Sequence, residues 1–129
     1  MPRIHGVHET VLYAADVAGL VAFYRDVVGL TEIDPPDQHS AAFQFDDGNV
    51  LLVFDPSRTS EPGRFVPEHG TSGHGHVAFK VDGLDERAHE LRSHDVEIER
   101  DITWPRGGRS VYFRDPAGNS VEYVEGQIW

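Results

Sequence analysis

Residues 73–81 read Gly-His-Gly-His-Val-Ala-Phe-Lys-Val, and from His76 onward the side chains alternate between two faces. One face receives Val77, Phe79 and Val81, whereas the other receives His76, Ala78 and Lys80. A period of two is typical of a β-strand that packs one face against a core. The opposite face carries an imidazole near the start of the strand. The function of this strand therefore depends on what that imidazole meets.

Working outward from this strand, both halves of the chain follow one order: strand, helix and three strands. In the first half we expect a helix at 17–28, capped by Asp16 and ended by Gly29, and strands at 4–13, 31–33, 41–45 and 50–54. In the second half we expect a helix at 84–94 and strands at 76–81, 96–100, 110–114 and 120–124. The composition of residues 55–73 indicates a linker or mobile loop. The sequence predicts a single α+β domain, 1–129, of two βαβββ modules at about 4–57 and 72–126.

Aligning one module with the other places potential metal ligands at equivalent positions. His76 falls on Glu9 in the first strands, and Glu122 falls on Leu52 in the last strands. Two related sheets packed about a pseudo-two-fold axis would bring such positions towards one cavity. Three of the four residues are of types that bind metals, so we predict Glu9, His76 and Glu122 as metal ligands.

Three protein ligands leave coordination positions open, which is typical of a catalytic rather than a structural metal site. The chain has no cysteine, so the ligand atoms are nitrogen and oxygen, which favours Mn, Fe, Co, Ni or Zn. Two carboxylates and a divalent cation sum to a neutral group that tolerates burial. Taken singly, each of the three residues would more often be an ordinary core or surface side chain. The repeat alignment is what favours the ligand set.

Other residues are candidates for substrate binding. Arg109 follows two glycines and could hold an anionic substrate group. Tyr13, Phe54, Trp104 and Tyr112 could line an apolar pocket, with ordinary core packing as the alternative. His74 shares a face with His76, which makes it an alternative ligand, a residue that supports one, or a simple loop residue.

Composition excludes several classes of partner. The formal net charge of −11 argues against nucleic acid and is compatible with a cationic ligand. No apolar run approaches the roughly 20 residues that span a bilayer, and the N-terminus has no apolar signal core. We therefore expect a cytoplasmic protein that acts on a small molecule.

Three segments resemble a known family. Residues 16–17 with 22–30, residues 75–79 and residues 114–122 are similar to signatures of the vicinal oxygen chelate superfamily, which contains glyoxalase I, bleomycin resistance proteins and extradiol dioxygenases. The resemblance implies paired βαβββ modules that form a cupped mixed sheet around a divalent metal, in a homodimer. Its ligand positions lie on the first and last strands of each module, here Glu9, Leu52, His76 and Glu122.

The resemblance leads to one leading function and two alternatives. We expect a metal-dependent, glyoxalase-like lyase or isomerase that binds vicinal oxygens of a small substrate and stabilises an enolate or oxyanion, with Glu122 or Glu9 as the proton-transfer base. Leu52 in the fourth position weighs against isomerisation of a glutathione hemithioacetal. A ligand set of two Glu and one His weighs against an extradiol dioxygenase. The other alternative is a metal-free, bleomycin-resistance-type binding protein.

Overall fold

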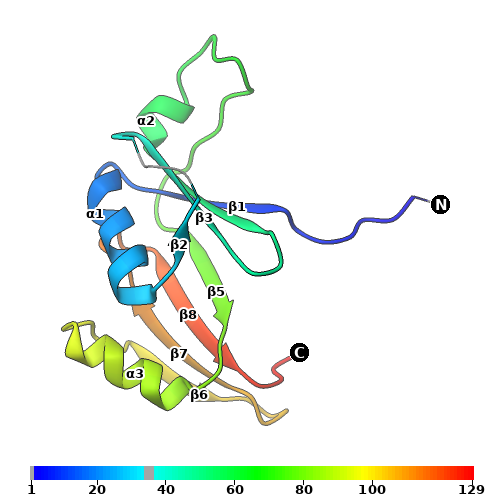
Figure 1. Ribbon diagram of the computed structural model, residues 1–129, viewed down its shortest axis with the longest axis vertical. Coiled ribbons are helices and arrows are strands. Elements are labelled where there is room, and N and C mark those ends of the chain that lie inside the picture. The colour runs from blue at the N-terminus through cyan, green and yellow to red at the C-terminus, as the bar shows by residue number, and fades with distance from the viewer. Residues whose placement is uncertain (1, 34–36) are drawn as a thin grey trace. The chain divides into compact units, whose positions relative to one another are not determined.

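The computed structural model describes residues 2–33 and 37–129, and it divides the chain into two compact units. The first unit ends at Ser72 and the second begins at Gly73. Each unit contains a four-stranded sheet of mixed direction (Figure 1). In both, the first strand pairs in parallel with the last, and the remaining strands pair in antiparallel fashion. The predicted α+β class and the tandem βαβββ modules are confirmed.

The sheet of the first unit has the strand order β1-β4-β3-β2. Its strands are β1 (Glu9–Tyr13), β2 (Thr31–Glu32), β3 (Ser40–Gln44) and β4 (Val50–Phe54). Helix α1 (Val17–Ala22) continues as a π-helix, η1 (Phe23–Val28). As predicted, the Asp16 side chain accepts from the Gly19 N–H at 3.0 Å at the start, and Gly29 ends the helix with φ 86°. One face of the sheet packs on this helix through Leu12, Ala41, Phe43, Leu51 and Val53, all buried.

The sheet of the second unit has the order β5-β8-β7-β6. It consists of β5 (His76–Lys80), β6 (Arg100–Thr103), β7 (Arg109–Arg114) and β8 (Ser120–Glu125). Helix α3 (Leu84–Ser93) lies along one face of this sheet (Figure 1). That face is the core of the unit and buries Leu84, Ala88, Leu91, Val111, Phe113, Val121 and Tyr123. The other face carries His76, Tyr112 and Glu122.

The structure differs from the sequence-based predictions at the start of two strands and in the segment predicted to be a loop. Strand β1 begins at Glu9 rather than at residue 4, because its partner β4 begins opposite Glu9. Residues 55–73 include a short helix, α2 (Pro56–Thr59), whose N-terminus is capped by Asp55. Strand β6 begins at Arg100 rather than at residue 96, because the Val96 N–H still donates to the Leu91 carbonyl and completes the end of α3.

Strand register reproduces the internal repeat. Val11 pairs with Leu52 in the first unit, and Ala78 pairs with Glu122 in the second. Glu9 and His76 each stand two residues before that pair, at the first position of their strands. The alignment made from sequence therefore holds residue by residue in the two sheets.

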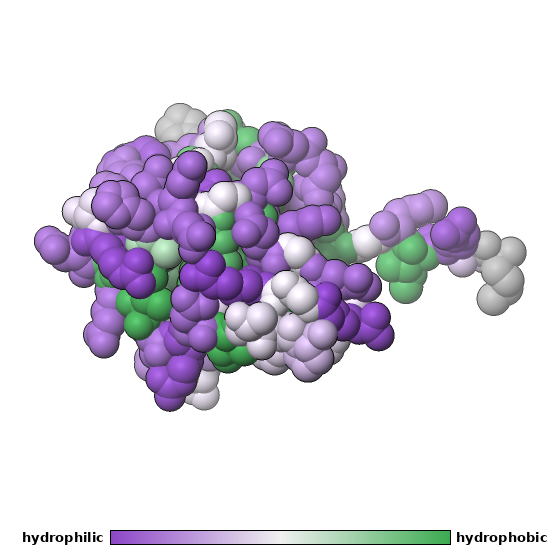
Figure 2. Space-filling view, turned by 90° about the horizontal axis from the view of Figure 1, so that it is seen from below, coloured by the Kyte–Doolittle hydropathy of each residue, from purple (hydrophilic) through white to green (hydrophobic). Residues whose placement is uncertain are grey.

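The surface agrees with the composition. Hydrophilic side chains predominate on the face drawn in Figure 2, and hydrophobic residues are scattered among them. Such a surface is expected for a chain with a formal net charge of −11. None of the helices formed by residues 2–33 and 37–129 combines the length and the apolar character needed to cross a membrane.

Candidate metal and catalytic site

His76 is held in one orientation by its own sheet. Strands β5 and β8 are parallel, and His76 lies opposite Ser120. The ring Nδ1 is 3.0 Å from the Ser120 carbonyl oxygen. Because a carbonyl only accepts, we infer that Nδ1 carries the proton of the neutral ring. The other nitrogen, Nε2, then presents a lone pair.

That lone pair meets a carboxylate. His76 Nε2 lies 3.2 Å from Glu122 Oε1, with the histidine side chain 50% exposed and the glutamate 6% exposed. A neutral imidazole nitrogen and a carboxylate oxygen are both acceptors, so at this separation they repel each other unless a proton or a metal cation is shared between them. The pair is open to solvent on the histidine side only.

A short chain of hydrogen bonds fixes the glutamate. The Ser110 hydroxyl donates to Glu122 Oε2 at 2.6 Å, and the Trp104 indole N–H donates to Ser110 Oγ at 2.9 Å. Ser110 is fully buried, and Glu122 is 5% exposed. A buried carboxylate requires such partners, because burial without them costs several kcal/mol. The bonds also leave Oε1 directed at His76.

Tyr112 completes this surface. It pairs with Glu122 across β7 and β8, and its ring stacks on the His76 ring with centroids 6.3 Å apart and planes 21° apart. Burial raises the pKa of the Tyr112 phenol, and the negative charge of Glu122 raises that pKa further. Tyr112 therefore stays protonated beside the carboxylate at neutral pH.

The pair suits a divalent metal by its chemistry. An imidazole nitrogen with its second nitrogen bonded to a carbonyl, beside a carboxylate bonded to a hydroxyl, is the typical arrangement around protein-bound transition metals. Within the described residues, no group of three or more His, Asp or Glu side chains is gathered closely enough to hold a metal ion. Two predicted ligands, His76 and Glu122, lie together in the second unit. Glu9 belongs to the first unit, so its part in the set stays a prediction.

Arg109 lies on the opposite face of the sheet from Glu122. Residues alternate along β7, so Arg109 points to the side covered by α3, whereas Ser110 and Tyr112 point to the side of Glu122. Its guanidinium donates to both Asp101 oxygens at 2.8 Å and to Asp85 at 2.6 Å. Arg109 ties β6 and α3 to β7, and this placement does not favour the predicted role in substrate binding.

The remaining predicted residues are distributed as follows. Trp104 lies in the site through its bond to Ser110. Tyr13 and Phe54 pair across β1 and β4 in the first unit, where both contact His69. The His74 ring lies over the turn at Gly118, where a Cβ added to the glycine would come within 2.8 Å of the ring Nε2. Ser110 is not among the residues predicted from sequence, although its position two residues before Tyr112 places it on the same face.

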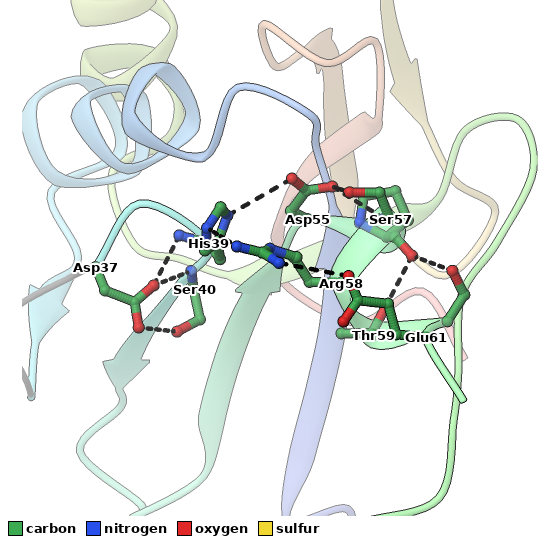
Figure 3. Close-up of polar contacts among 10 residues, drawn as sticks. Asp37, His39, Ser40, Asp55, Ser57, Arg58, Thr59 and Glu61 are labelled. Carbon is green, nitrogen blue, oxygen red and sulfur yellow. Dashed lines mark hydrogen bonds and ion pairs between the residues drawn. The ribbon is translucent and has the colours of Figure 1, made fainter. Parts of the chain in front are cut away.

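A second polar cluster surrounds α2 in the first unit (Figure 3). Arg58 Nη2 lies 2.8 Å from His39 Nε2, and Arg58 Nη1 lies 3.4 Å from Glu61. His39 Nδ1 is buried and makes no hydrogen bond to the residues that the structure describes, and Asp55 Oδ2 is 3.8 Å away. Hydrogen bonds from Ser57 lower the pKa of Asp55. These contacts fix the short helix on the ends of β3 and β4.

Comparisons with known proteins agree with this architecture. The family model of the Glyoxalase/Bleomycin resistance protein/Dioxygenase superfamily matches residues 6–123. The chain is 38% identical to a lactoylglutathione lyase from Agrobacterium tumefaciens of known structure, with a TM-score of 0.91 and 98% of each chain covered. A glyoxalase/dioxygenase structure from Nostoc punctiforme matches with 26% identity, a TM-score of 0.71, and coverage of 95% of this chain and 92% of that one.

A protein of Escherichia coli (strain K12), the uncharacterized protein YaeR, is 32% identical in an alignment of 126 residues. The match covers 92% of this chain and 95% of that protein. The family match spans both units, including the strands that carry His76 and Glu122. The chain belongs to the Glyoxalase/Bleomycin resistance protein/Dioxygenase superfamily.

Proposed function

We propose that this protein is a metal-dependent lyase or isomerase of the glyoxalase-like branch. The observation that carries the proposal is the 3.2 Å approach of His76 Nε2 to Glu122 Oε1, while His76 Nδ1 lies 3.0 Å from the Ser120 carbonyl oxygen. Glu9 is the predicted third ligand. A bound divalent cation would polarise vicinal oxygens of a small substrate and stabilise an enolate or oxyanion.

The side chains around the pair have separate tasks. Ser120 fixes the orientation of the imidazole, and Ser110 fixes that of Glu122. Glu9 is exposed, and its side chain makes no hydrogen bond to any described residue, so its carboxylate is the freer of the two to accept and return a substrate proton. We therefore assign proton transfer to a Glu9 oxygen, and we expect Glu9→Gln to lower kcat more strongly than it raises KM.

The first substrate to test is the hemithioacetal of methylglyoxal and glutathione, because the Agrobacterium relative bears the name lactoylglutathione lyase. Leu52 occupies the fourth position expected for such an enzyme. Because leucine cannot serve as the fourth ligand, the proposal also includes substrates other than the glutathione adduct, smaller ones among them. We also propose that the protein is a cytoplasmic homodimer.

Elemental analysis of purified protein tests the metal directly. We expect about one divalent ion per chain in the wild type and loss of most of it in His76→Ala. His89→Ala is the matched control, because it removes an exposed imidazole of helix α3 that has no predicted role in the site. Unchanged metal content in His76→Ala would rule out the ligand pair. A metal-free wild type that binds a cationic drug would instead support the bleomycin-resistance alternative, which the net charge of −11 favours. Ferrous iron with oxygen uptake on catechols would indicate a dioxygenase.

A further inference from the structure

The loop formed by residues 60–70 closes on itself at one oxygen atom. The Thr59 carbonyl accepts the His69 backbone N–H at 2.9 Å and Arg64 Nη1 at 3.0 Å. Thr59 is 2% exposed and belongs to α2, which the Arg58 contacts in Figure 3 hold in place. Compact loops with joined ends are frequently functional. This closure places the Arg64 guanidinium beside the backbone of His69.

Arg64 is half-buried, and its side chain donates to a backbone carbonyl rather than to a carboxylate. It and His69 are the two residues of the loop that are half-buried rather than exposed. Four other arginines form ion pairs with carboxylates: Arg25, Arg58, Arg109 and Arg114. Arg64 has no carboxylate within ion-pair distance among the described residues, although the chain carries 22 acidic residues. Most of its N–H donors therefore remain for a ligand.

His69 offers a second donor. The Tyr13 hydroxyl bonds to His69 Nδ1, and the edge of the Phe54 ring packs on the imidazole with centroids 5.4 Å apart. Burial raises the pKa of Tyr13, so its hydroxyl stays protonated, and we infer that this hydroxyl donates to Nδ1. The proton of the neutral imidazole then sits on Nε2, and that nitrogen makes no hydrogen bond to the part of the chain that the structure describes.

We propose that Arg64 and the Nε2–H of His69 bind a carboxylate group of the substrate, with Tyr13 as the residue that positions the imidazole. A planar guanidinium matches a planar carboxylate through paired hydrogen bonds, and Phe54 provides an apolar wall for the carbon chain that carries it. This subsite takes the anion-binding role that the sequence favoured for Arg109. It rests on the proposed function for the identity of the substrate.

Two hemithioacetals of methylglyoxal test the subsite. The adduct with glutathione carries carboxylates, and the adduct with 2-mercaptoethanol carries none. We expect Arg64→Gln and His69→Gln to raise KM for the glutathione adduct on the order of tenfold with kcat little changed, and to leave the neutral adduct unaffected. Arg92→Gln is the control for loss of one positive charge on an exposed helix surface. An equal change for both adducts, or no change for either, would overturn the proposal.

A binding measurement separates this inference from the proposed function. If the wild type converts neither adduct, the proposed function has failed and nitrogen NMR of the histidine rings decides the subsite alone. Addition of glutathione should shift the His69 Nε2 signal in the wild type and not in Arg64→Gln. Arg64→Lys keeps the charge but loses the paired geometry, so it should restore only part of the shift. Absence of any shift in the wild type would overturn the subsite.

Discussion

Replacing Ser110 by alanine removes the bond that holds Glu122. Loss of a 2.6 Å hydrogen bond to a buried carboxylate costs about 1.5–3 kcal/mol. The Trp104 indole N–H loses its acceptor as well, but it is only half-buried and can bond to water, so it adds at most about 1 kcal/mol. We therefore expect Ser110→Ala to lower the free energy of unfolding by about 1.5–4 kcal/mol.

Urea unfolding of protein treated with a chelator measures this cost without a contribution from bound metal. Ser120→Ala is a matched control on the same face of the sheet, because His76 bonds to the Ser120 backbone carbonyl and not to its hydroxyl. That variant should stay within about 0.5 kcal/mol of the wild type. Metal affinity of Ser110→Ala should also fall by about 10- to 100-fold in a competition with a chelator. If both serine variants unfold at the same urea concentration, the Ser110 bond does not stabilise Glu122.

Three further predictions follow from other contacts of the same unit. Glu122→Gln should lower the pKa of Tyr112, measured by NMR titration of the ring, because the charge that raises it is gone; an unchanged pKa would mean that burial acts alone. Arg114 lowers the pKa of Glu99 and Arg109 lowers that of Asp101, so both carboxylates contribute stability that is lost as the pH falls through their folded-state pKa values. The double variant Glu99→Gln, Asp101→Asn should therefore lose less stability below about pH 4 than the wild type. Parallel plots of unfolding free energy against pH for the two proteins would contradict this. Gly118→Ala should lower the free energy of unfolding by about 1–2 kcal/mol because of the positive φ, and by a further amount because the new Cβ displaces the His74 ring. Adding His74→Ala should reduce this loss to that of Gly48→Ala, because Gly48 has a similar φ and open surroundings.

The sequence predicted those features that depend on pattern. Among residues 2–33 and 37–129, six of the eight strands were located to within one residue at each end, whereas β1 was predicted to begin five residues too early and β6 four residues too early. The repeat then paired His76 with Glu9 and Glu122 with Leu52, and the observed register has the same correspondence. Strand β6 was misplaced because Val96 and Ile98 alternate like a strand while the chain is still completing the end of α3.

The sequence pattern did not predict contacts that depend on which partner a side chain bonds to. Arg109 looked like a free cation after two glycines, but the parity of β7 turns it to the helix-covered face, where Asp101 and Asp85 bind it. Arg64 and His69 looked like loop residues, and only the closure of the loop on Thr59 brings them together. Hydrogen bonds between residues far apart in sequence leave no periodic signal, so they had to be read from the structure.

The two units show how one topology carries two kinds of surface. In the first unit, three equivalent positions of β3 and β4 hold Ser40, Ala42 and Leu52, and in the second the same positions of β7 and β8 hold Ser110, Tyr112 and Glu122. Ser40 bonds outward to Asp37, because Leu52 offers nothing to accept its proton, whereas Ser110 bonds inward to Glu122. A buried glutamate is stable only where a donor such as Ser110 accompanies it. The polar residues at these positions of the second unit therefore depend on one another, and that set, rather than the shared fold, carries the chemistry proposed here.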